Sequence, residues 1–307
     1  MARRKKGRPV SGWLVLDKPL ELGSTQAVGK LRWLFQAQKA GHAGTLDPLA
    51  TGVLPIAFGE ATKTVPFVTD GMKSYRFSIR WGRATNTDDA EGEVVARSDE
   101  RPSESDVLEL LPRFRGEIAQ VPPAFSAIKI DGKRAYAEAR AGREVELEAR
   151  KIFIESFDLV DMGDADHATF EVSCGSGTYV RSLARDLGEA LGCCAHVSDL
   201  RRTFVEPFEE NDAVLLDHLL ALEGDLAALD DYLISPRQAM TGYPELRVDA
   251  DQARRIRLGN GIILRGRDVP VESEDVCAIH RGELVAIGNV EKGSFNPRRV
   301  LAAPTSA

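Results

Sequence analysis

The clearest alternation of apolar and polar residues lies at positions 75–81, where Tyr75, Phe77, Ile79 and Trp81 occupy every second position. Successive side chains of a strand point to opposite faces of its sheet, so this period predicts a strand with one buried face. Shorter apolar runs bounded by turn residues predict further strands. These runs cover positions 12–17, 53–58, 153–160 and 168–174.

Apolar residues at helical spacing predict several helices between these strands. Ser24 is the expected N-cap of the first helix, because a serine side chain can accept a hydrogen bond from an amide of the first turn. Strands and helices follow one another without a regular strand–helix alternation, which indicates an α+β fold. The expected helices cover positions 24–35, 103–111, 134–140 and 178–191, with one or two more within 212–233.

A sequence boundary near positions 240–244 divides the chain, because Thr-Gly-Tyr-Pro interrupts the helical pattern there. Beyond it, a short basic helix at 252–258 precedes short apolar segments separated by glycine turns, as in a small β-barrel. The 307 residues also agree with two domains at about 150 residues each. We therefore expect a domain at 1–240 and a second domain at 241–307.

Positions 41–52 hold three glycines and one proline, which predicts a shaped loop instead of a helix or strand. Asp47 lies inside this loop, and Pro48 restricts its backbone conformation. An exposed carboxylate on a rigid loop suits nucleophilic attack on a sugar carbon or a base. An aspartate that only caps a turn produces the same local pattern, and local chemistry alone favours that structural role.

Several classes of site and location are disfavoured by the sequence. His42 has no second ligand at helical or hairpin spacing, which argues against a metal site. The glycine loop lacks the spacing of the nucleotide-phosphate motifs. Four cysteines without metal spacing, two of them adjacent, fit a reducing cytoplasm. No apolar run approaches the roughly 18 residues of a membrane span.

The formal net charge of -7 conceals an uneven distribution along the chain. Positions 1–83 hold 14 basic and 5 acidic residues, and positions 252–307 hold 9 and 6. Positions 206–251 hold only 2 basic residues against 12 acidic ones. Nucleic-acid binding responds to local potential, so the basic blocks are compatible with an RNA partner. The acidic block is then expected to face away from the RNA.

The loop also carries a resemblance to a known family. Residues 41–55, with their continuation at 59–63, closely resemble the catalytic segment of the TruB family of bacterial tRNA pseudouridine synthases. The resemblance implies a mixed, largely antiparallel sheet of the pseudouridine synthase type and a PUA-like RNA-binding module at the C-terminus. It also implies isomerisation of uridine 55 in the T loop of tRNA, without a metal, nucleotide or redox cofactor. Other motifs similar to the family lie at 16–19, 73–76, 87–92, 122–129, 177–183 and 196–202.

The same resemblance assigns roles to individual residues. Asp47 would be the nucleophile that frees uracil from C1′ of its ribose, so that C5 can rejoin. An arginine partner, Arg181, would favour the ionised carboxylate and orient it. Asp89 is the expected partner in the Arg181 region, within an acidic segment that departs from the Asp-Ala-Asp-Gly of many relatives. The remaining expected substrate contacts are Tyr75 against the target base, Tyr179 with Leu200 at the uracil, His42 within the T loop, and Lys18 in the N-terminal motif.

Two other functions are compatible with parts of this pattern. One is a tRNA chaperone or RNA-binding protein whose enzyme fold is idle, although the intact set of Asp47, Tyr75 and Arg181 argues against it. The other is a glycosyl-transfer enzyme acting on a free nucleoside, which would not require basic ends or an RNA-binding module. The sequence has no strong interface pattern, so a monomer is expected.

Overall fold

The computed structural model describes residues 7–126, 129–130, 133–134, 147–264 and 272–303. By its internal contacts the chain forms two compact units. Unit 1 comprises residues 1–47, 53–70 and 205–307, and unit 2 comprises residues 48–52 and 71–204. The chain therefore passes from unit 1 to unit 2 between Asp47 and Pro48, inside the glycine-rich segment. The expected division after residue 240 stays a prediction.

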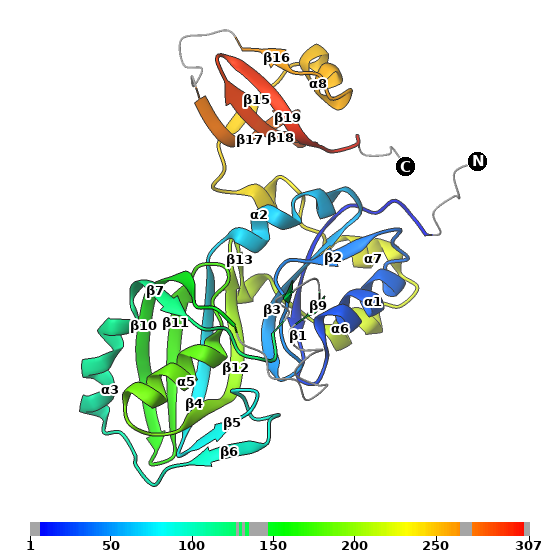
Figure 1. The fold of residues 1–307 in the computed structure, drawn as a ribbon. Coiled ribbons are helices and arrows are strands. Elements are labelled where there is room, and N and C mark those ends of the chain that lie inside the picture. The colour runs from blue at the N-terminus through cyan, green and yellow to red at the C-terminus, as the bar shows by residue number, and fades with distance from the viewer. Residues whose placement is uncertain (1–6, 127–128, 131–132, 135–146, 265–271, 304–307) are drawn as a thin grey trace. The chain divides into compact units, whose positions relative to one another are not determined.

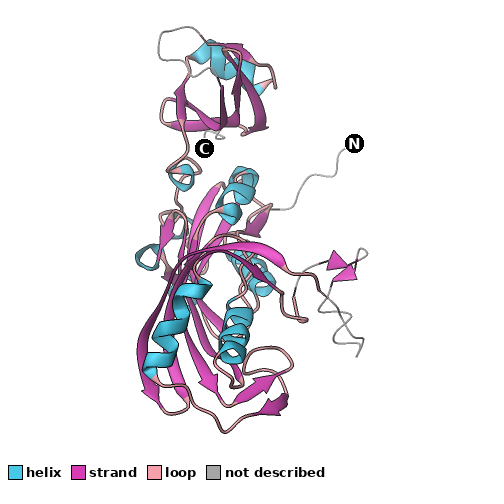
Figure 2. Ribbon diagram, turned by 60° about the vertical axis from the view of Figure 1, so that its left-hand side comes forward, coloured by secondary structure: helices cyan, strands magenta, loops and turns pink. Residues whose placement is uncertain are grey.

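Unit 2 is built on a mixed sheet in the order β3-β12-β4-β11-β10-β7. The start of β3 pairs with β12 in parallel, whereas β4, β11, β10 and β7 pair in antiparallel fashion. Helix α5 lies along one face of this sheet (Figures 1 and 2). The strands are β3 (Ala50–Phe58), β12 (Ala195–Val205), β4 (Lys73–Trp81), β11 (His167–Cys174), β10 (Arg150–Asp164) and β7 (Gly116–Gln120), and the helices are α3 (Glu104–Leu110), η2 (Leu111–Phe114) and α5 (Val180–Ala190).

The predicted alternation at 75–81 is confirmed in β4. Tyr75, Phe77, Ile79 and Trp81 are buried, while the residues between them are half-buried or exposed. Phe77 stacks with Phe170 of the neighbouring β11 and with Phe157 of β10, at centroid distances of 5.7 and 5.9 Å. The apolar face of β4 thus forms part of the core of unit 2.

Helix α5 has the burial pattern of an amphipathic helix. Val180, Leu183, Ala184 and Leu187 are buried, at the spacing of one helical face. The helix begins at Val180, with Tyr179 at the N-cap, two residues later than the sequence predicts. Gly192 follows its end at a φ of 72°, a left-handed conformation that glycine adopts without steric cost.

Unit 1 has two parts, and the larger one lies outside the C-terminal sheet. Its strands follow the order β14-β1-β3, and β2 pairs with the end of β3. Its core includes Trp13, Val15, Val53, Ala57 and Phe208. The expected acidic helical region forms two short helices, α6 and α7. The elements are β1 (Gly12–Lys18), α1 (Ser24–Leu34), β2 (Ala40–His42), η1 (Gly59–Lys63), α2 (Val65–Asp70), η3 (Glu210–Asp212), β14 (Val214–Leu215), α6 (Leu216–Ala221), α7 (Leu226–Asp230) and η4 (Gln238–Met240).

The C-terminal part of unit 1 is a curled five-stranded sheet in the order β15-β17-β18-β19-β16 (Figure 1). Ile256, Val285 and Phe295 are fully buried in its core. The sequence did not predict β15 or β19, because β15 is very short and β19 contains Pro297 and two arginines instead of alternating apolar residues. The elements are β15 (Glu245–Arg247), α8 (Ala250–Arg257), β16 (Ile262–Ile263), β17 (Glu272–His280), β18 (Glu283–Glu291) and β19 (Ser294–Val300).

The prediction that all of 41–52 is an irregular loop is wrong at both ends. Strand β2 extends to His42 and β3 begins at Ala50. Gly52 lies inside β3 at a φ of 97°, which glycine adopts without steric cost, and it pairs with Arg202 of β12. The irregular part is therefore the segment 43–49.

The expected helix at 134–140 lies outside the described residues, except for Arg134 at the end of a short strand. Among the described residues, no helix has the length and apolar character needed to cross a bilayer. The short strands not yet named are β5 (Arg83–Thr85), β6 (Val94–Arg97), β8 (Lys129–Ile130), β9 (Lys133–Arg134) and β13 (Phe208–Glu209).

Candidate functional site

Asp47 lies at the end of the loop residues 43–47, which are anchored in unit 1 at Ala43 and Leu46. The amide of Ala43 donates to the carbonyl of Pro55 at 2.9 Å, and Ala43 and Leu46 are buried. Asp47 itself is half-buried, between buried Leu46 and exposed Pro48. Its backbone is therefore anchored on one side, and the residue as a whole is partly exposed to solvent.

Ser24 bonds to the backbone of Leu46, the residue before Asp47, and the sequence did not predict this contact. Its hydroxyl accepts a hydrogen bond from the amide of Leu46 at 2.8 Å and donates to the carbonyl of Leu46 at 2.7 Å. The prediction that Ser24 caps α1 is wrong, because Gly23 occupies the N-cap and Ser24 is already helical. A helix-start serine gives no local signal that its hydroxyl bonds to a loop 22 residues away.

The chain beyond Asp47 is fixed in unit 2 by β12. Leu200 lies opposite Ala50, and Arg202 lies opposite Gly52. A Cβ on Gly52 would lie 2.2 Å from the carbonyl oxygen of Arg202, so only glycine fits this approach. The half-buried Leu200 thus belongs to the strand that receives the end of the loop.

Arg181 forms a buried ion pair with Asp89 inside unit 2. Arg181 Nη1 lies 3.3 Å from Asp89 Oδ2, and both side chains are only 8% exposed. The same guanidinium donates to the carbonyls of Thr87 at 2.9 Å and Phe125 at 3.0 Å. Asp89 also accepts hydrogen bonds from the Thr87 hydroxyl and from the amide of Glu91. The acidic segment and the start of α5 are therefore joined through charged and polar contacts.

A second ion pair lies beside the first, and the sequence did not point to it. Arg185 Nη1 lies 2.9 Å from Asp88 Oδ2, and Arg185 also donates to the carbonyl of Val121 at 2.8 Å. Burial raises the pKa of the Asp88 carboxyl from its ordinary 3.8 to about 6, although Arg185 and Arg181 oppose this shift. Arg185 follows Arg181 by one helical turn, which was the available signal.

Tyr75 is 8% exposed on β4, and its hydroxyl is hydrogen-bonded by the side chain of Arg202. Arg202 is 1% exposed, and its burial lowers the pKa of the guanidinium, an effect that Tyr75 opposes. A buried charge needs hydrogen-bonding partners, so Tyr75 contributes to the stability of this arginine. The buried tyrosine side chain is therefore bonded to a buried cation.

Tyr179 is positioned through its backbone by Gln120, another residue that sequence reasoning missed. The amide of Tyr179 donates to Gln120 Oε1 at 2.9 Å, and Gln120 Nε2 donates to the Tyr179 carbonyl at 3.1 Å. Gln120 is 1% exposed at the end of β7. This two-point contact fixes the N-cap of α5, from which both Tyr179 and Arg181 project.

Lys18 and His42 belong to unit 1, as does Asp47. The ammonium of Lys18 donates to the carbonyls of Pro19 and Leu22, each at 2.8 Å, and the residue is fully buried. It holds the turn that leads into α1. His42 is half-buried at the end of β2, opposite Ile56 of β3. The predicted roles of Lys18 and His42 toward substrate stay predictions.

The predicted site residues thus fall into two groups. Lys18, His42 and Asp47 lie in unit 1, and the second group lies in unit 2 and consists of Tyr75, Asp89, Tyr179, Arg181 and Leu200.

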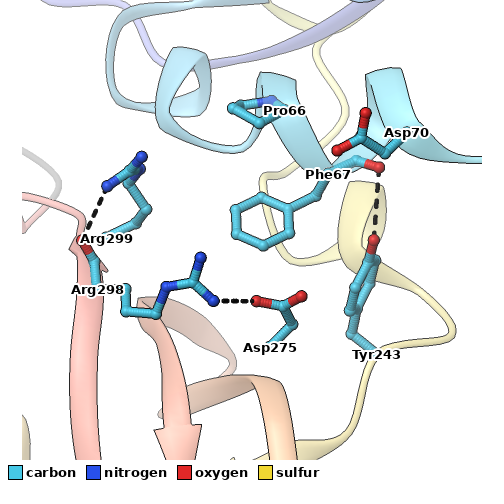
Figure 3. Close-up of a pocket in the computed structure, with 7 residues that line it drawn as sticks. All are labelled: Pro66, Phe67, Asp70, Tyr243, Asp275, Arg298 and Arg299. Carbon is cyan, nitrogen blue, oxygen red and sulfur yellow. Dashed lines mark hydrogen bonds and ion pairs between the residues drawn. The ribbon is translucent and has the colours of Figure 1, made fainter.

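A pocket of unit 1 contains none of the predicted residues. Tyr243 and Phe67 meet there edge to face, and Arg298 pairs with Asp275 at 2.9 Å (Figure 3). Its lining residues are Pro66, Phe67, Asp70, Tyr243, Asp275, Arg298 and Arg299.

The basic start of the chain is partly neutralised by the acidic block. Arg8 forms a two-point contact with the carboxylate of Asp230 in α7. Arg254 and Arg255 of α8 are exposed in the C-terminal part of the chain, and Arg254 pairs with Asp251 of the same helix at 3.1 Å. Exposed basic side chains on one short helix present a positive surface that is suited to phosphate contact.

Comparisons with known proteins agree with this arrangement of elements. Residues 32–180 match the TruB family pseudouridylate synthase N-terminal domain, and residues 181–240 match the tRNA pseudouridylate synthase B C-terminal domain. A tRNA pseudouridine synthase B from Sinorhizobium medicae (strain WSM419) is 57% identical over 98% of each chain. The protein of the same name from Brucella suis (strain ATCC 23445 / NCTC 10510) is 53% identical, over 99% of this chain and 100% of its own.

Solved structures show the same fold at lower sequence identity. A chain of a Cbf5-Nop10-Gar1 complex has a TM-score of 0.72 at 24% identity, covering 94% of this chain and 84% of its own. A chain of the archaeal box H/ACA sRNP Nop10-Cbf5 complex has a TM-score of 0.71 at 22% identity, covering 99% and 94%. The expected fold class, with its mixed sheet and small curled C-terminal sheet, is confirmed. The family matches and the near full-length relatives place this chain in the TruB family of pseudouridylate synthases.

Proposed function

We propose that this chain isomerises uridine 55 in the T loop of tRNA to pseudouridine, with Asp47 as the nucleophile on a flipped-out uridine. The observation that carries the proposal is Asp47 itself, half-buried at the end of a loop whose preceding residue is bonded through both backbone groups. A nucleophile on an anchored backbone is held close to the geometry that attack on a substrate requires.

The reaction rearranges bonds within one nucleotide. The bond between N1 and C1′ breaks, and a bond between C5 and C1′ forms. The hydrogen on C5 leaves to solvent as a proton, while N1 gains one. Attack on the sugar, attack on the base and a route through a glycal all use the ionised form of Asp47 and balance without an oxidant or reductant.

The target base must leave its stack before the chemistry, at a cost of a few kcal/mol. Stacking on aromatic side chains returns about 1–3 kcal/mol per base. We assign Tyr75 to the face of the target base, and Tyr179 with Leu200 to the uracil pocket. His42 is assigned to the T loop position that the target nucleotide vacates. Lys18 is assigned to support of the substrate-binding segment, which agrees with its two carbonyl contacts.

Arg181 is the proposed electrostatic partner of the nucleophile. A nearby guanidinium favours the ionised form of a carboxylate and lowers the cost of using it as a nucleophile. Asp89 holds Arg181 in place through the buried ion pair, so that the arginine does not rotate freely. A guanidinium fixed by two carbonyls and a carboxylate is preorganised, as efficient catalysis requires.

The rest of the proposal concerns the partner and its setting. The curled C-terminal sheet with α8 is assigned to RNA binding, with tRNA as its ligand and the exposed arginines of α8 on its phosphates. The enzyme is proposed to act as a cytoplasmic monomer. Residues 1–240 would then form the catalytic domain and residues 241–307 the RNA-binding domain.

The deciding experiment uses unmodified tRNA as substrate. Wild-type protein and the Asp47→Ala variant are each incubated with the tRNA, and pseudouridine is mapped by carbodiimide labelling and primer extension. We expect a stop at the T loop uridine with wild type only. Tight tRNA binding without product would favour an idle RNA-binding protein, and product from free uridine would favour a nucleoside enzyme.

A second variant separates catalysis from structure. Asp47→Asn should retain tRNA binding and lose turnover, because one carboxylate contributes little to an interface dominated by phosphate contacts. Binding is measured by filter retention of labelled tRNA, and turnover by the mapping assay. Collapse of binding in Asp47→Asn would show that Asp47 only stabilises its turn.

A further inference from the structure

We propose that Ser24 is a positioning residue for catalysis, which holds the backbone of Asp47 in the reactive arrangement through Leu46. The inference rests on the proposed role of Asp47 as nucleophile. Its direct support is the pair of hydrogen bonds between one serine hydroxyl and both backbone groups of the residue before Asp47. No family motif quoted above includes Ser24, and a helix-start serine would ordinarily be expected to cap its own helix.

The geometry of the contact fixes two successive peptide planes. The amide of Leu46 belongs to the plane between Thr45 and Leu46, and the carbonyl of Leu46 belongs to the plane that contains the amide of Asp47. The hydroxyl of Ser24 bonds to both, at 2.8 and 2.7 Å. Because a peptide plane is rigid, these two bonds limit both backbone dihedral angles of Leu46. The direction in which the chain enters Asp47 is thereby determined.

The other side of Asp47 is limited by Pro48. A proline restricts the backbone of the residue before it, so the accessible conformations of Asp47 are reduced. The carboxylate is then left mainly with rotation about its own side-chain bonds. Ser24 and Pro48 together restrict one short backbone stretch from its two ends.

The contact between Ser24 and Leu46 is buried, and the Ser24 hydroxyl acts in it as both donor and acceptor. Ser24 and Leu46 are each 3% exposed, so water cannot easily replace the hydroxyl. A serine hydroxyl has one donor and can accept as well, and here both functions go to the same residue. Replacement of Ser24 by alanine would leave an amide and a carbonyl of the catalytic loop without this partner, and the loop would shift to recover hydrogen bonds.

A positioning role predicts a particular kinetic effect. A displacement of about 1 Å in a catalytic group costs on the order of 100-fold in rate, whereas substrate binding through distant contacts is unaffected. Ser24→Ala should therefore lower the rate constant of the chemical step by about 10- to 100-fold. A loss of stability alone would instead reduce the fraction of active enzyme and leave the rate constant of the folded molecules unchanged.

The experiment measures both quantities in a single-turnover assay. Excess protein is mixed with tRNA that carries tritium at C5 of uridine, and tritium release is followed, because C5 loses its hydrogen when it bonds to C1′. The rate constant at saturating protein reports the chemical step, and the protein concentration needed to reach saturation, with tRNA above its dissociation constant, reports the active fraction. The dissociation constant for tRNA is measured in parallel by filter binding.

Four variants give the comparison its control. Ser24→Ala removes the hydroxyl, and Ser24→Thr keeps it and should recover most of the rate. Ser24→Cys preserves the shape with a weak donor, so it tests the proposal if Ser24→Ala does not fold. Ser103→Ala removes another serine hydroxyl, which caps α3 by accepting a hydrogen bond from Asp106 at 3.2 Å. It should lower stability without changing the rate constant.

The outcomes separate this inference from the proposed function. If wild type makes no pseudouridine, the proposed function fails, and the role of Ser24 fails with it. If wild type is active, Asp47→Ala is inactive and both Ser24→Ala and Ser24→Cys react at the wild-type rate constant, only the role of Ser24 is refuted. A rate loss shared with Ser103→Ala, or one explained by weaker tRNA binding, would also refute it.

Discussion

The guanidinium of Arg181 lies 3.3 Å from the carboxylate of Asp89, and both side chains are 8% exposed. A charge in such a position is tolerated only while its partner is present, because the energy lost on removal from water is recovered from that partner. The pair therefore joins the acidic segment to α5, and its energetic contribution should differ from that of a surface ion pair.

Replacement of Asp89 by alanine should destabilise the protein by about 3–5 kcal/mol, because it leaves the Arg181 charge buried without its carboxylate. The measurement is urea denaturation followed by intrinsic fluorescence. Glu171→Ala is the control, since Glu171 pairs with Arg76 where the two side chains are 49% and 58% exposed. That exposed pair should contribute less than about 1 kcal/mol. Equal effects of the two substitutions would contradict this interpretation.

Gly52 is expected to be irreplaceable where the catalytic loop joins β12. Gly52→Ala would place a Cβ 2.2 Å from the Arg202 carbonyl oxygen at a φ of 97°, so the strand pairing must shift. We expect a loss of about 1–3 kcal/mol in unfolding free energy together with a fall in activity. Gly41→Ala is the matched control, because within the described part of the chain no atom beyond its two sequence neighbours lies within 4 Å of its added Cβ. A Gly52→Ala protein with unchanged stability would show that β3 and β12 adapt freely.

Asp88 should make the stability of the protein depend on pH. Burial raises the pKa of its carboxyl from 3.8 to about 6, so the folded state binds a proton more tightly than the unfolded chain. The stability contributed by the protonated group is complete below pH 3.8 and is lost as pH rises through about 6. The contribution is measured as the difference between wild type and Asp88→Asn, which has no such carboxyl.

Unfolding free energies are compared for the two proteins between pH 4 and pH 7. The difference between wild type and Asp88→Asn should change across this interval, with wild type losing relative stability as pH rises. Asp158→Asn serves as a control, because it removes a carboxylate from an exposed pair with Arg115. A constant difference between wild type and Asp88→Asn would mean that the folded pKa of Asp88 is ordinary.

Binding and turnover of tRNA should weaken as salt concentration rises, because contacts between arginines and phosphates release bound counterions. The logarithm of the affinity is measured against the logarithm of salt concentration. Arg255→Ala should reduce the slope by about one unit if Arg255 of α8 contacts a phosphate. Arg237→Ala should not, since Arg237 is paired with Glu245 at 2.8 Å. A flat salt response would exclude phosphate contacts by the basic segments.

Local sequence patterns were sufficient for the elements that obey one period. The alternation of β4 and the amphipathic spacing of α5 predict these elements within one or two residues of their ends. In both elements the spacing of the buried side chains along the chain sets the element type, and this spacing is visible in the local sequence. The glycine-rich segment is also recognisable from the sequence, and its resemblance to a known family predicts Asp47 as the nucleophile.

The contacts that hold these residues depend on the tertiary structure. The sequence predicts Ser24 as a helix cap, yet its hydroxyl bonds to Leu46, 22 positions away. Gln120 gives no sequence signal, yet it binds both backbone groups of Tyr179. Hydrogen-bond partners across such separations are set by how strands and helices pack, and a local pattern contains no information about them.

The charge distribution also shows what the local sequence determines and what depends on the tertiary structure. The sequence alone determined that basic and acidic residues occupy separate stretches, so that a net charge of -7 is compatible with an RNA partner. Only the tertiary structure decided which charges neutralise one another, as Arg8 and Asp230 do in unit 1 and Arg181 and Asp89 do in unit 2. Charge is a property of composition, whereas pairing requires two side chains to meet, and folding alone brings distant side chains together.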